Sequence, residues 1–421
     1  MASKKLARGV ALVGAGMSYF GAFKGKSSRD LFVEAFQEML DSIDKPFDPK
    51  TIEALYVGNY SSDLFENQGH IAPIMASWAG LTPLPAVRVE DACASAGVAL
   101  REGILAVASG MYDLVVVGGV EKMTDLPTER VTDTLATAAD AQYEIPAGFT
   151  FPGFYASMAT AYMADYGATP ETFMKVGIKN HENGSLNEKA QFGAKVSSMM
   201  KARQEKAAKR GLPIPEWNDE LDFLHDDRAN PNIAWPMRLY DCSPVSDGAA
   251  VVLIASEELA AKLSDHPIYV AGIGQASDGA LHDREVVTSI PSAKLAAEKA
   301  YEMAGITPKD INFAEVHDCF TIAEVIATED LGFFEKGTGW KAAEAGETAR
   351  DGSKPINLSG GLKSKGHPVG ASGIGQVVEV WKQLRGEAGQ RQLGGDLKYG
   401  LTHNVGGTGQ TCVVHIFERR N

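Results

Sequence analysis

Residues 10–16 read VALVGAG, an apolar run that ends in glycine, and residues 268–274 read IYVAGIG, a run of the same form. Both runs are typical of buried β-strands that end in a glycine turn. A second pair of segments also repeats. A cysteine follows a strand-like run in DAC at residues 91–93 and again in HDC at residues 317–319, each time before an apolar, helix-like run. Repetition on the scale of a domain, unlike a short solenoid period, predicts two fused α/β halves.

Further apolar runs predict the other elements of these halves. Strand-like runs cover residues 86–89, 114–117, 249–254, 311–316 and 411–417, and helical apolar spacing covers residues 28–42, 95–109, 291–304 and 373–384. We therefore expect an N-terminal half of residues 1–121 plus 245–267, and a C-terminal half of residues 268–421.

Residues 122–244 differ from both halves, because they lack strand alternation and are rich in methionine, aromatic and charged side chains. We interpret them as an inserted, mainly helical loop domain. Within it, residues 201–227 are notably polar. This stretch predicts a solvated excursion, or alternatively an element that shapes a pocket or binds a partner.

The composition limits the class of protein. The chain has 421 residues, which exceeds one ordinary domain, and its 44% hydrophobic and 22% charged residues are in the range of soluble globular proteins. Its net charge of −14 argues against general binding of nucleic acid or of a membrane surface. An acidic chain can still hold a local basic groove for an anionic ligand.

The four cysteines, Cys93, Cys242, Cys319 and Cys412, are far apart and form no CxxC pair. This spacing indicates neither a zinc site nor a disulfide framework, so no metal is expected. Free thiols favour a reducing compartment. No secretory apolar region and no transmembrane span is visible, so the simplest expectation is a cytoplasmic protein.

Cys93 is the first candidate catalytic residue. It follows the strand-like run 86–89, and the next residues, 94–100, are small and then apolar. A cysteine at the start of a helix meets unsatisfied N–H groups and the positive end of the helix dipole, which favour the thiolate. The alternative is an inert buried cysteine that packs as a small hydrophobic residue.

His367 is the second candidate, and it lies in the glycine-dense segment SGGLKSKGHPVGASG at residues 359–373. Pro368 disfavours helical backbone at His367, so the imidazole is expected on a loop before a helix. A histidine in this place can accept a proton from a thiol. The alternative is a phosphate-binding glycine loop, but the full P-loop pattern is missing.

Two more segments carry groups for this chemistry. Chemistry at a carbon next to a carbonyl needs a base near the α-carbon and donors for the enolate oxygen, and His317 and Cys319 in HDCF (residues 317–320) could supply them. Alternatively, Asp318 caps a helix and its neighbours pack. The segment HNVGGTG at residues 403–409 predicts a small-residue turn, which suits close backbone approach to a substrate or a simple hairpin.

Taken together, these motifs resemble the thiolase family. The resemblance spans nearly the whole chain and follows the order of the family: DACASAG around Cys93, SPVSDGAA at residues 243–250, HDCF at 317–320, GGLKSKGHPVGASG around His367 and HNVGGTG at 403–409. The HDCF form is similar to the sterol-carrier-protein type of thiolase and to its archaeal and bacterial acetyl-CoA acetyltransferase relatives.

The resemblance implies a fold and a set of roles. The fold would be the five-layered αβαβα thiolase fold, in which two duplicated βαβαβαββ halves carry a loop domain that covers coenzyme A. Cys93 would accept the acyl group, His367 would activate it, and His317 would help to hold the thioester oxygen. The N–H groups of Cys93 and Gly406 would form a second oxyanion hole, and Ser243 would contact coenzyme A.

One position departs from the common family pattern. Many thiolases carry a second catalytic cysteine in a C-terminal CxG motif, where this chain reads Asn404-Val405-Gly406. Cys319 is the expected substitute, as in the HDCF relatives. Asn404 becomes a candidate supporting residue beside the catalytic groups.

The resulting prediction is a thiolase that cleaves a 3-oxoacyl-CoA with coenzyme A, or runs the reverse Claisen condensation, through an acyl group on Cys93. Alternatives are a decarboxylative condensing enzyme of the ketoacyl-synthase kind and a non-catalytic acyl-CoA-binding scaffold subunit. A dinucleotide oxidoreductase is a weaker alternative, because no complete GxGxxG follows Gly14.

The resemblance also implies the partners of the chain. Coenzyme A would be a substrate, and no cofactor would be bound permanently. The family suggests a homodimer or a dimer of dimers, and some relatives work with a small zinc-ribbon/OB-fold protein.

Overall fold

The computed structural model describes residues 5–420, and its core is a mixed nine-stranded sheet with the strand order β3-β2-β4-β7-β1-β8-β11-β10-β9. The strands are β1 (Val10–Met17), β2 (Ala54–Gly58), β3 (Ala86–Val89), β4 (Leu114–Glu121), β7 (Gly248–Ser256), β8 (Ile268–Ser277), β9 (Phe313–Glu315), β10 (Tyr399–Gly406) and β11 (Thr411–Arg419). The sheet contains every strand expected from an apolar run.

The strand order reveals the predicted duplication. Read outward from the centre, β1, β7, β4 and β2 of the first half match β8, β11, β10 and β9 of the second half. The two halves meet where β1 pairs with β8, antiparallel and only at Ala11–Tyr269 and Leu12–Ile268. In both halves the inner pairings are antiparallel and the outer ones parallel.

The duplication is incomplete at one edge. The counterpart of β3 in the second half is reduced to a single parallel bridge between Ala314 and Ile356. Pro355 has no N–H to donate and Asn357 has a left-handed backbone with φ of 58°, so a longer strand cannot form here. The strand expected over residues 311–316 is likewise shorter, Phe313–Glu315.

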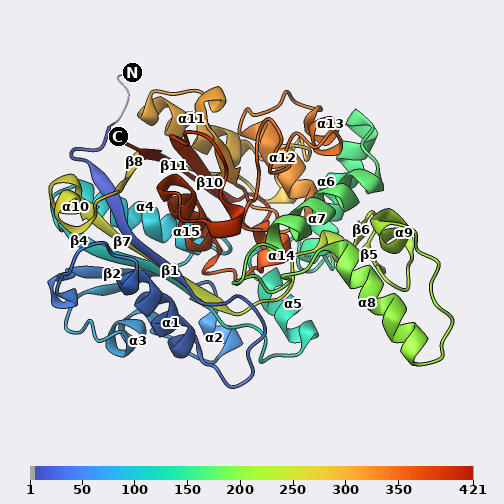
Figure 1. Ribbon diagram of the computed structural model, residues 1–421, viewed down its shortest axis with the longest axis horizontal. Coiled ribbons are helices and arrows are strands. Elements are labelled where there is room, and N and C mark those ends of the chain that lie inside the picture. Colours follow the sequence, from blue (N-terminus) through green and yellow to red (C-terminus); the bar gives the residue numbers. More distant parts are fainter. Residues whose placement is uncertain (1–4, 421) are drawn as a thin grey trace.

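The two halves of the sheet form two separate layers, and the helices lie outside and between them, which gives five layers in the order αβαβα (Figure 1). On the outer face of the first half lie α1 (Ser28–Asp41), α3 (Ile71–Trp78) and α10 (Glu257–Leu263), and on that of the second half lie α11 (Pro291–Ala304) and α12 (Thr321–Asp330). Between the halves lie α4 (Ser95–Ala108) and α15 (Ser372–Arg385), and α15 contacts strands of both. The arrangement implied by the resemblance is therefore present.

The repeated glycine runs have a packing reason. An added Cβ at Gly16 of β1 would lie 2.3 Å from the backbone nitrogen of Met39 in α1, and one at Gly274 of β8 would lie 1.9 Å from the carbonyl oxygen of Ala296 in α11. Each half therefore presses its first helix directly onto the backbone of its first strand. Side chains larger than hydrogen would separate the layers.

The segment between β4 and β7 is mainly helical. It contains α5 (Thr128–Ala136), α6 (Phe151–Tyr166), α7 (Pro170–Gly184), α8 (Val196–Lys209) and α9 (Glu220–His225), and α8 projects from the body of the molecule (Figure 1). It also contains a hairpin that was not expected, β5 (Asn232–Ala234) and β6 (Met237–Arg238), whose strands are too short to show alternation. The boundaries of the three units stay predictions.

Three short helices complete the fold, α2 (Ser62–Phe65), α13 (Gly339–Glu344) and α14 (Gly361–Lys365). Among the described residues, no helix is both long and apolar enough to cross a membrane.

Candidate active site

Three residues from distant parts of the chain meet between the two halves. Cys93 lies between β3 and α4, His317 follows β9, and His367 lies on the loop between α14 and α15. The sulfur of Cys93 and one ring nitrogen of each histidine all lie within 4.8 Å of one another. The residues that the sequence singled out on separate motifs are therefore in reach of one substrate.

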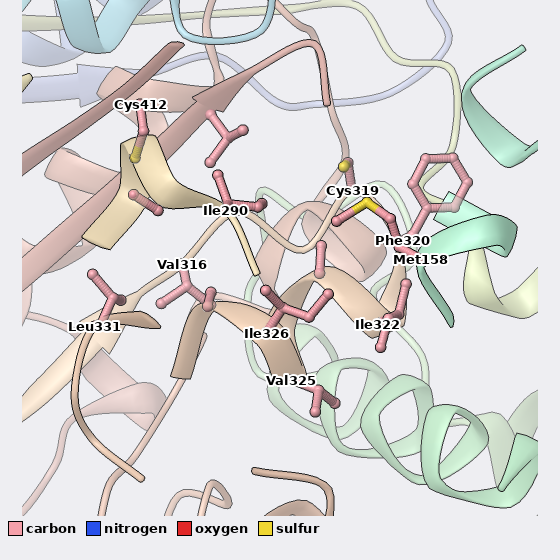
Figure 2. Packing of buried hydrophobic residues seen from close by; sticks show 14 of the residues in the cluster. Met158, Ile290, Val316, Cys319, Phe320, Ile322, Val325, Ile326, Leu331 and Cys412 are labelled. Carbon is pink, nitrogen blue, oxygen red and sulfur yellow. The ribbon is translucent and has the colours of Figure 1, made fainter. Parts of the chain in front are cut away.

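A cavity of about 160 Å³ opens beside Cys93. Its wall includes Cys319, His367, Ser243 and Gly407, and its apolar lining comes from Met123, Leu135, Phe151, Phe320 and Val369. Cys319 is buried, and Figure 2 shows it next to Phe320 and Met158. These residues belong to a hydrophobic cluster that also includes buried side chains of α12. A thiol from each half thus faces the same apolar space.

Cys93 does not have the ionisation that its place before a helix suggests. Burial raises its pKa to about 12, and the N–H groups of Gly407 and of Cys93 itself, which face the sulfur, lower it only in part. Loss of hydration outweighs the helix dipole here. Desolvation therefore favours the neutral thiol in the free protein and opposes the helix-start effect that favours the thiolate.

His367 is oriented by a serine. Its Nδ1 lies 2.7 Å from the Ser372 hydroxyl, and that hydroxyl donates its only hydrogen to the carbonyl of Pro368 at 2.9 Å. With this hydrogen on the Pro368 carbonyl, the Ser372 oxygen accepts from Nδ1–H, and the arrangement leaves the lone pair on Nε2. Burial lowers the pKa of His367 to about 3, so the ring is a neutral base.

His317 stands edge-on to His367, with ring centroids 5.1 Å apart and planes at 84°. Burial lowers the pKa of His317 well below its ordinary value, so this ring is also neutral. Its Nδ1 lies 3.2 Å from Nδ2 of Asn404, whereas its Nε2 has no hydrogen-bond partner within the described chain. The sequence placed Asn404 near the site but could not show which atoms it meets.

Cys319 has an unexpected neighbour, Tyr155 of α6. Burial raises the pKa of Cys319 well above its ordinary value, and hydrogen bonding with the Tyr155 hydroxyl opposes this only in part. Tyr155 itself stacks on Phe320 with ring centroids 4.6 Å apart. No sequence signal distinguished Tyr155 from the other aromatic residues of the inserted segment.

The small-residue turn begins later than expected. Strand β10 continues through Gly406, so His403 and Asn404 are buried strand residues and the turn starts at Gly407. Gly407 lines the cavity, whereas Gly406 packs so closely beneath Asp91 that an added Cβ would lie 2.5 Å from its carbonyl oxygen. The oxyanion role expected of Gly406 stays a prediction.

The trio of Cys93, His317 and His367 also has the spacing of a metal site. A thiolate and imidazoles are usual ligands of zinc, but a ligating cysteine must lose its proton. Burial favours the protonated thiol at Cys93.

Two family models match the chain, "Thiolase, N-terminal domain" over residues 10–258 and "Thiolase C-terminal domain-like" over residues 274–419. The chain belongs to the thiolase family. This result confirms the resemblance and favours a thiolase over the ketoacyl-synthase and oxidoreductase alternatives.

Individual relatives agree with this family. An acetyl-CoA acetyltransferase of Methanothermobacter thermautotrophicus is 46% identical and covers 98% of this thiolase and 100% of its own length. Sterol carrier protein 2 of Bos taurus is 32% identical and covers 97% of this chain and 72% of its own length. These two relatives are an archaeal acetyl-CoA acetyltransferase and a sterol carrier protein, the two kinds of protein that the resemblance named.

Solved structures agree with the fold. The Ltp2-ChsH2(DUF35) aldolase has a TM-score of 0.77 at 25% identity and covers 98% of both chains. Human mitochondrial 3-ketoacyl-CoA thiolase in complex with CoA has a TM-score of 0.68 at 18% identity and covers 100% of both chains. The thiolase fold is therefore confirmed.

A second cavity of this thiolase, about 260 Å³, continues the first toward the inserted segment. The two cavities share Cys242, Ser243 and Pro244, and the second is also lined by Arg203 of α8 and Lys363 of α14. Lys363 is buried and forms no ion pair within 4.0 Å among residues 5–420, and the carboxylates of Asp241 and Asp318 act on its charge from farther away. The predicted contact residue Ser243 thus lines both the cavity beside Cys93 and the cavity beside these basic side chains.

Proposed function

We propose that this thiolase cleaves 3-oxoacyl-CoA thioesters with coenzyme A and catalyses the reverse condensation, with the acyl group carried on Cys93. The observation that carries the proposal is the meeting of the Cys93 sulfur with ring nitrogens of His317 and His367 within 4.8 Å. The acetyl group is the proposed acyl group, because the 46% identical relative is an acetyl-CoA acetyltransferase.

In the cleavage direction, the first step is attack of the Cys93 sulfur on the 3-oxo carbon. Nε2 of His367 takes the thiol proton as the carbon–sulfur bond forms, so a thiolate is needed only at the moment of attack. The N–H groups of Cys93 and Gly406 are proposed to hold the oxygen that becomes negative. Gly407, whose N–H faces the sulfur, lies beside this hole.

The second step breaks the bond between the substrate carbons C2 and C3. The electron pair moves into an enolate, His317 holds its oxygen, and the Cys319 thiol delivers a proton to C2, which releases acetyl-CoA. The raised pKa of Cys319 fits this role, because the thiol stays protonated until the carbanion forms. The thiol of a second coenzyme A then attacks the acyl-Cys93 and gives its proton to the Cys319 thiolate, while His367 returns its proton to the Cys93 sulfur as the acyl group leaves.

Coenzyme A is proposed to enter through the second cavity. Its pantetheine arm would pass Ser243, and its phosphates would meet the cationic side chains of Arg203 and Lys363. A buried ammonium group without a carboxylate partner suits an anionic ligand. The acidic net charge of the chain does not oppose this binding, because the basic groups are local.

The deciding experiment is transfer of an acetyl group from acetyl-CoA to the protein. We expect mass spectrometry of the intact protein to show one added acetyl group, located on Cys93 by peptide mapping. Cys93→Ala should abolish the adduct and lower the cleavage rate by about 10³-fold or more, the usual cost of losing a covalent nucleophile.

The matched control is Cys412→Ala, which removes a buried thiol of β11 and should keep the adduct. An adduct on another residue, or cleavage at the normal rate by Cys93→Ala, would refute the mechanism. Use of malonyl-CoA in place of acetyl-CoA as the condensing partner would favour the decarboxylative alternative.

The partners proposed for the chain are a second copy and a small subunit. Strand β3 lies at the edge of the sheet with Val87 exposed, and an unprotected edge of this kind invites a partner strand. The Ltp2-ChsH2(DUF35) aldolase, at a TM-score of 0.77, supports a small partner subunit. We place this enzyme in the cytoplasm, because its four cysteines are free.

A further inference from the structure

The buried side-chain amide of Asn404, on β10, contacts both Cys93 and His317. Its Nδ2 lies 3.0 Å from the carbonyl oxygen of Cys93 and 3.2 Å from Nδ1 of His317, and its Oδ1 accepts from the backbone N–H of Gly97 at 3.3 Å. These contacts account for all its polar atoms. The mechanism proposed above assigns no step to Asn404.

The orientation of this amide is determined by groups that cannot change roles. Cys93 offers a carbonyl, which only accepts, and Gly97 offers an N–H, which only donates. A flipped amide would set its oxygen against the Cys93 oxygen and its NH₂ against the Gly97 N–H. Nδ2 must therefore face Cys93 and His317.

The first turns of α4 and α15 hold the amide in place. An added Cβ at Gly97 would lie 2.7 Å from Oδ1 of Asn404, and one at Gly373 would lie 2.2 Å from it. Both helices approach the amide closely because both positions are glycine. The side chain is wedged between them and has no room to rotate away.

The two hydrogens of Nδ2 thus go to the Cys93 carbonyl and to Nδ1 of His317, and both receive them as acceptors. A neutral imidazole that accepts at Nδ1 carries its proton on Nε2. We propose that Asn404 is a positioning residue that fixes His317 as the Nε2–H tautomer, so that His317 donates a hydrogen bond to the substrate thioester oxygen. This inference rests on the proposed function.

The two histidines beside Cys93 then have opposite proton positions. Ser372 keeps the proton of His367 on Nδ1, which makes its Nε2 a base, whereas Asn404 keeps the proton of His317 on Nε2, which makes it a donor. A donor is needed where an enolate oxygen develops, in the carbon–carbon step. Acetyl transfer to Cys93 relies on backbone N–H groups instead, and should depend less on Asn404.

The proposal is tested by which of two variants, Asn404→Ala or Asn404→Asp, cleaves 3-oxoacyl-CoA faster. Asn404→Ala removes the donor and lets both tautomers form, and we expect 3-oxoacyl-CoA cleavage to slow by about 10- to 100-fold, while acetyl transfer to Cys93 slows by about threefold or less. Asn404→Asp keeps the shape, but its carboxylate accepts from Nδ1–H and selects the wrong tautomer, so cleavage should slow further. If shape alone mattered, Asn404→Asp would be the more active variant, and that result would overturn the proposal.

Nitrogen-15 NMR of histidine-labelled protein reads the tautomer directly. We expect His317 to show a bare Nδ1 and a protonated Nε2 in the wild type, both tautomers in Asn404→Ala, and the reverse pattern in Asn404→Asp. The signals are assigned by their loss in His317→Gln. A proton on Nδ1 of His317 in the wild type would overturn the proposal, whatever the kinetic results. This outcome needs only the wild-type protein, so it holds even if a variant fails to fold.

The matched control is Gln376→Glu. This buried amide donates to the carbonyl of His403 at 3.0 Å, next to Asn404 in sequence, and has no hydrogen bond to His317. The same amide-to-acid change should leave the His317 tautomer unchanged. Failure of the proposed function would appear differently, as the absence of an acetyl adduct on Cys93 in the wild type.

Discussion

At the scale of single residues, the site is built from neutral groups that burial keeps neutral. Cys93 keeps its proton because its pKa is raised to about 12. The His367 imidazole stays neutral and does not become an imidazolium, because its pKa is lowered to about 3. The pair can exchange a proton during attack without separating charge in the resting state. The direction of transfer is determined by Ser372, which leaves only Nε2 of His367 free to accept.

The lowered pKa of His367 predicts how acetyl transfer to Cys93 depends on pH. A lowered pKa keeps the imidazole neutral as the pH falls, so the base stays competent down to about pH 4. We expect the rate of acetylation to change by about twofold or less between pH 7 and pH 5. For a histidine with the ordinary pKa of about 6.5, the fraction in the neutral base form would fall by about 25-fold over the same range.

Rapid-quench acetylation followed by mass spectrometry measures this rate. Circular dichroism at each pH serves as the control for unfolding, since several other buried histidines must also gain protons when the chain unfolds. A steep fall of the rate near pH 6.5, with the fold intact, would mean that the free imidazole of His367 is solvated and not desolvated.

At the scale of elements, Glu121 at the end of β4 joins three segments. Its Oε1 accepts from Ser61 N–H and from the side-chain amide of Asn59, and its Oε2 accepts from the N–H groups of Tyr60 and Gly370. Gly370 belongs to the loop that carries His367, so this carboxylate ties the base of the second half to the first half. Burial raises the pKa of Glu121 to about 7, and the N–H donors oppose that rise.

The substitution Glu121→Gln tests this link. Glutamine has one accepting oxygen and an NH₂ group, so two of the four N–H groups would face another donor. We expect the free energy of unfolding to fall by about 1–3 kcal/mol, the cost of buried donors without partners, as measured by urea denaturation. Cleavage activity should fall as well, because the His367 loop loses an anchor.

The control for this substitution is Glu102→Gln, since Glu102 lies on the exposed face of α4 with 40% of its side chain accessible. That change should stay within about 0.5 kcal/mol, as is usual for surface positions. Equal stability of the two variants would show that the Glu121 carboxylate contributes no more than a surface charge.

At the scale of the whole molecule, the nine-stranded sheet ends differently on its two sides. At one edge, β9 is partly covered by the bridge between Ala314 and Ile356. At the other edge, β3 exposes Val87, which has 47% of its surface accessible. An apolar, unpaired edge is a liability in a monomer. The proposed homodimer would cover it.

Val87→Asp tests whether β3 is the dimer edge. We expect light scattering after size-exclusion chromatography to show twice the chain mass for the wild type and the monomer mass for the variant, because a buried unpaired carboxylate would weaken association by about 100-fold or more. The control Val286→Asp places the same charge on an exposed valine in the loop before α11. A dimer that survives Val87→Asp would place the interface elsewhere.

Local patterns in the chain predicted seven of the nine strands of the large sheet, all except β2 and β10, and four of the helices. The four helices expected from apolar spacing lie within one residue of α1, α4, α11 and α15, because burial of one helical face imposes a period that is visible in the sequence. The bridge at Ile356 and the hairpin β5–β6 were missed, since elements of one to three residues carry no period. The small-residue surroundings of Cys93 and His367 marked both as exceptional without any structure.

The amino-acid sequence was sufficient to predict the duplicated halves and the thiolase motifs, and to propose Cys93, His317, Cys319 and His367 as the candidate chemical groups. The desolvation of Cys93 and the contacts of Asn404 and Ser372 with Nδ1 of two adjacent imidazoles are visible only in the folded molecule. The physical reason is distance along the chain. Periodicity and turn chemistry depend on neighbours in sequence, whereas desolvation and hydrogen-bond direction depend on groups that are hundreds of residues apart and meet only when both halves have folded.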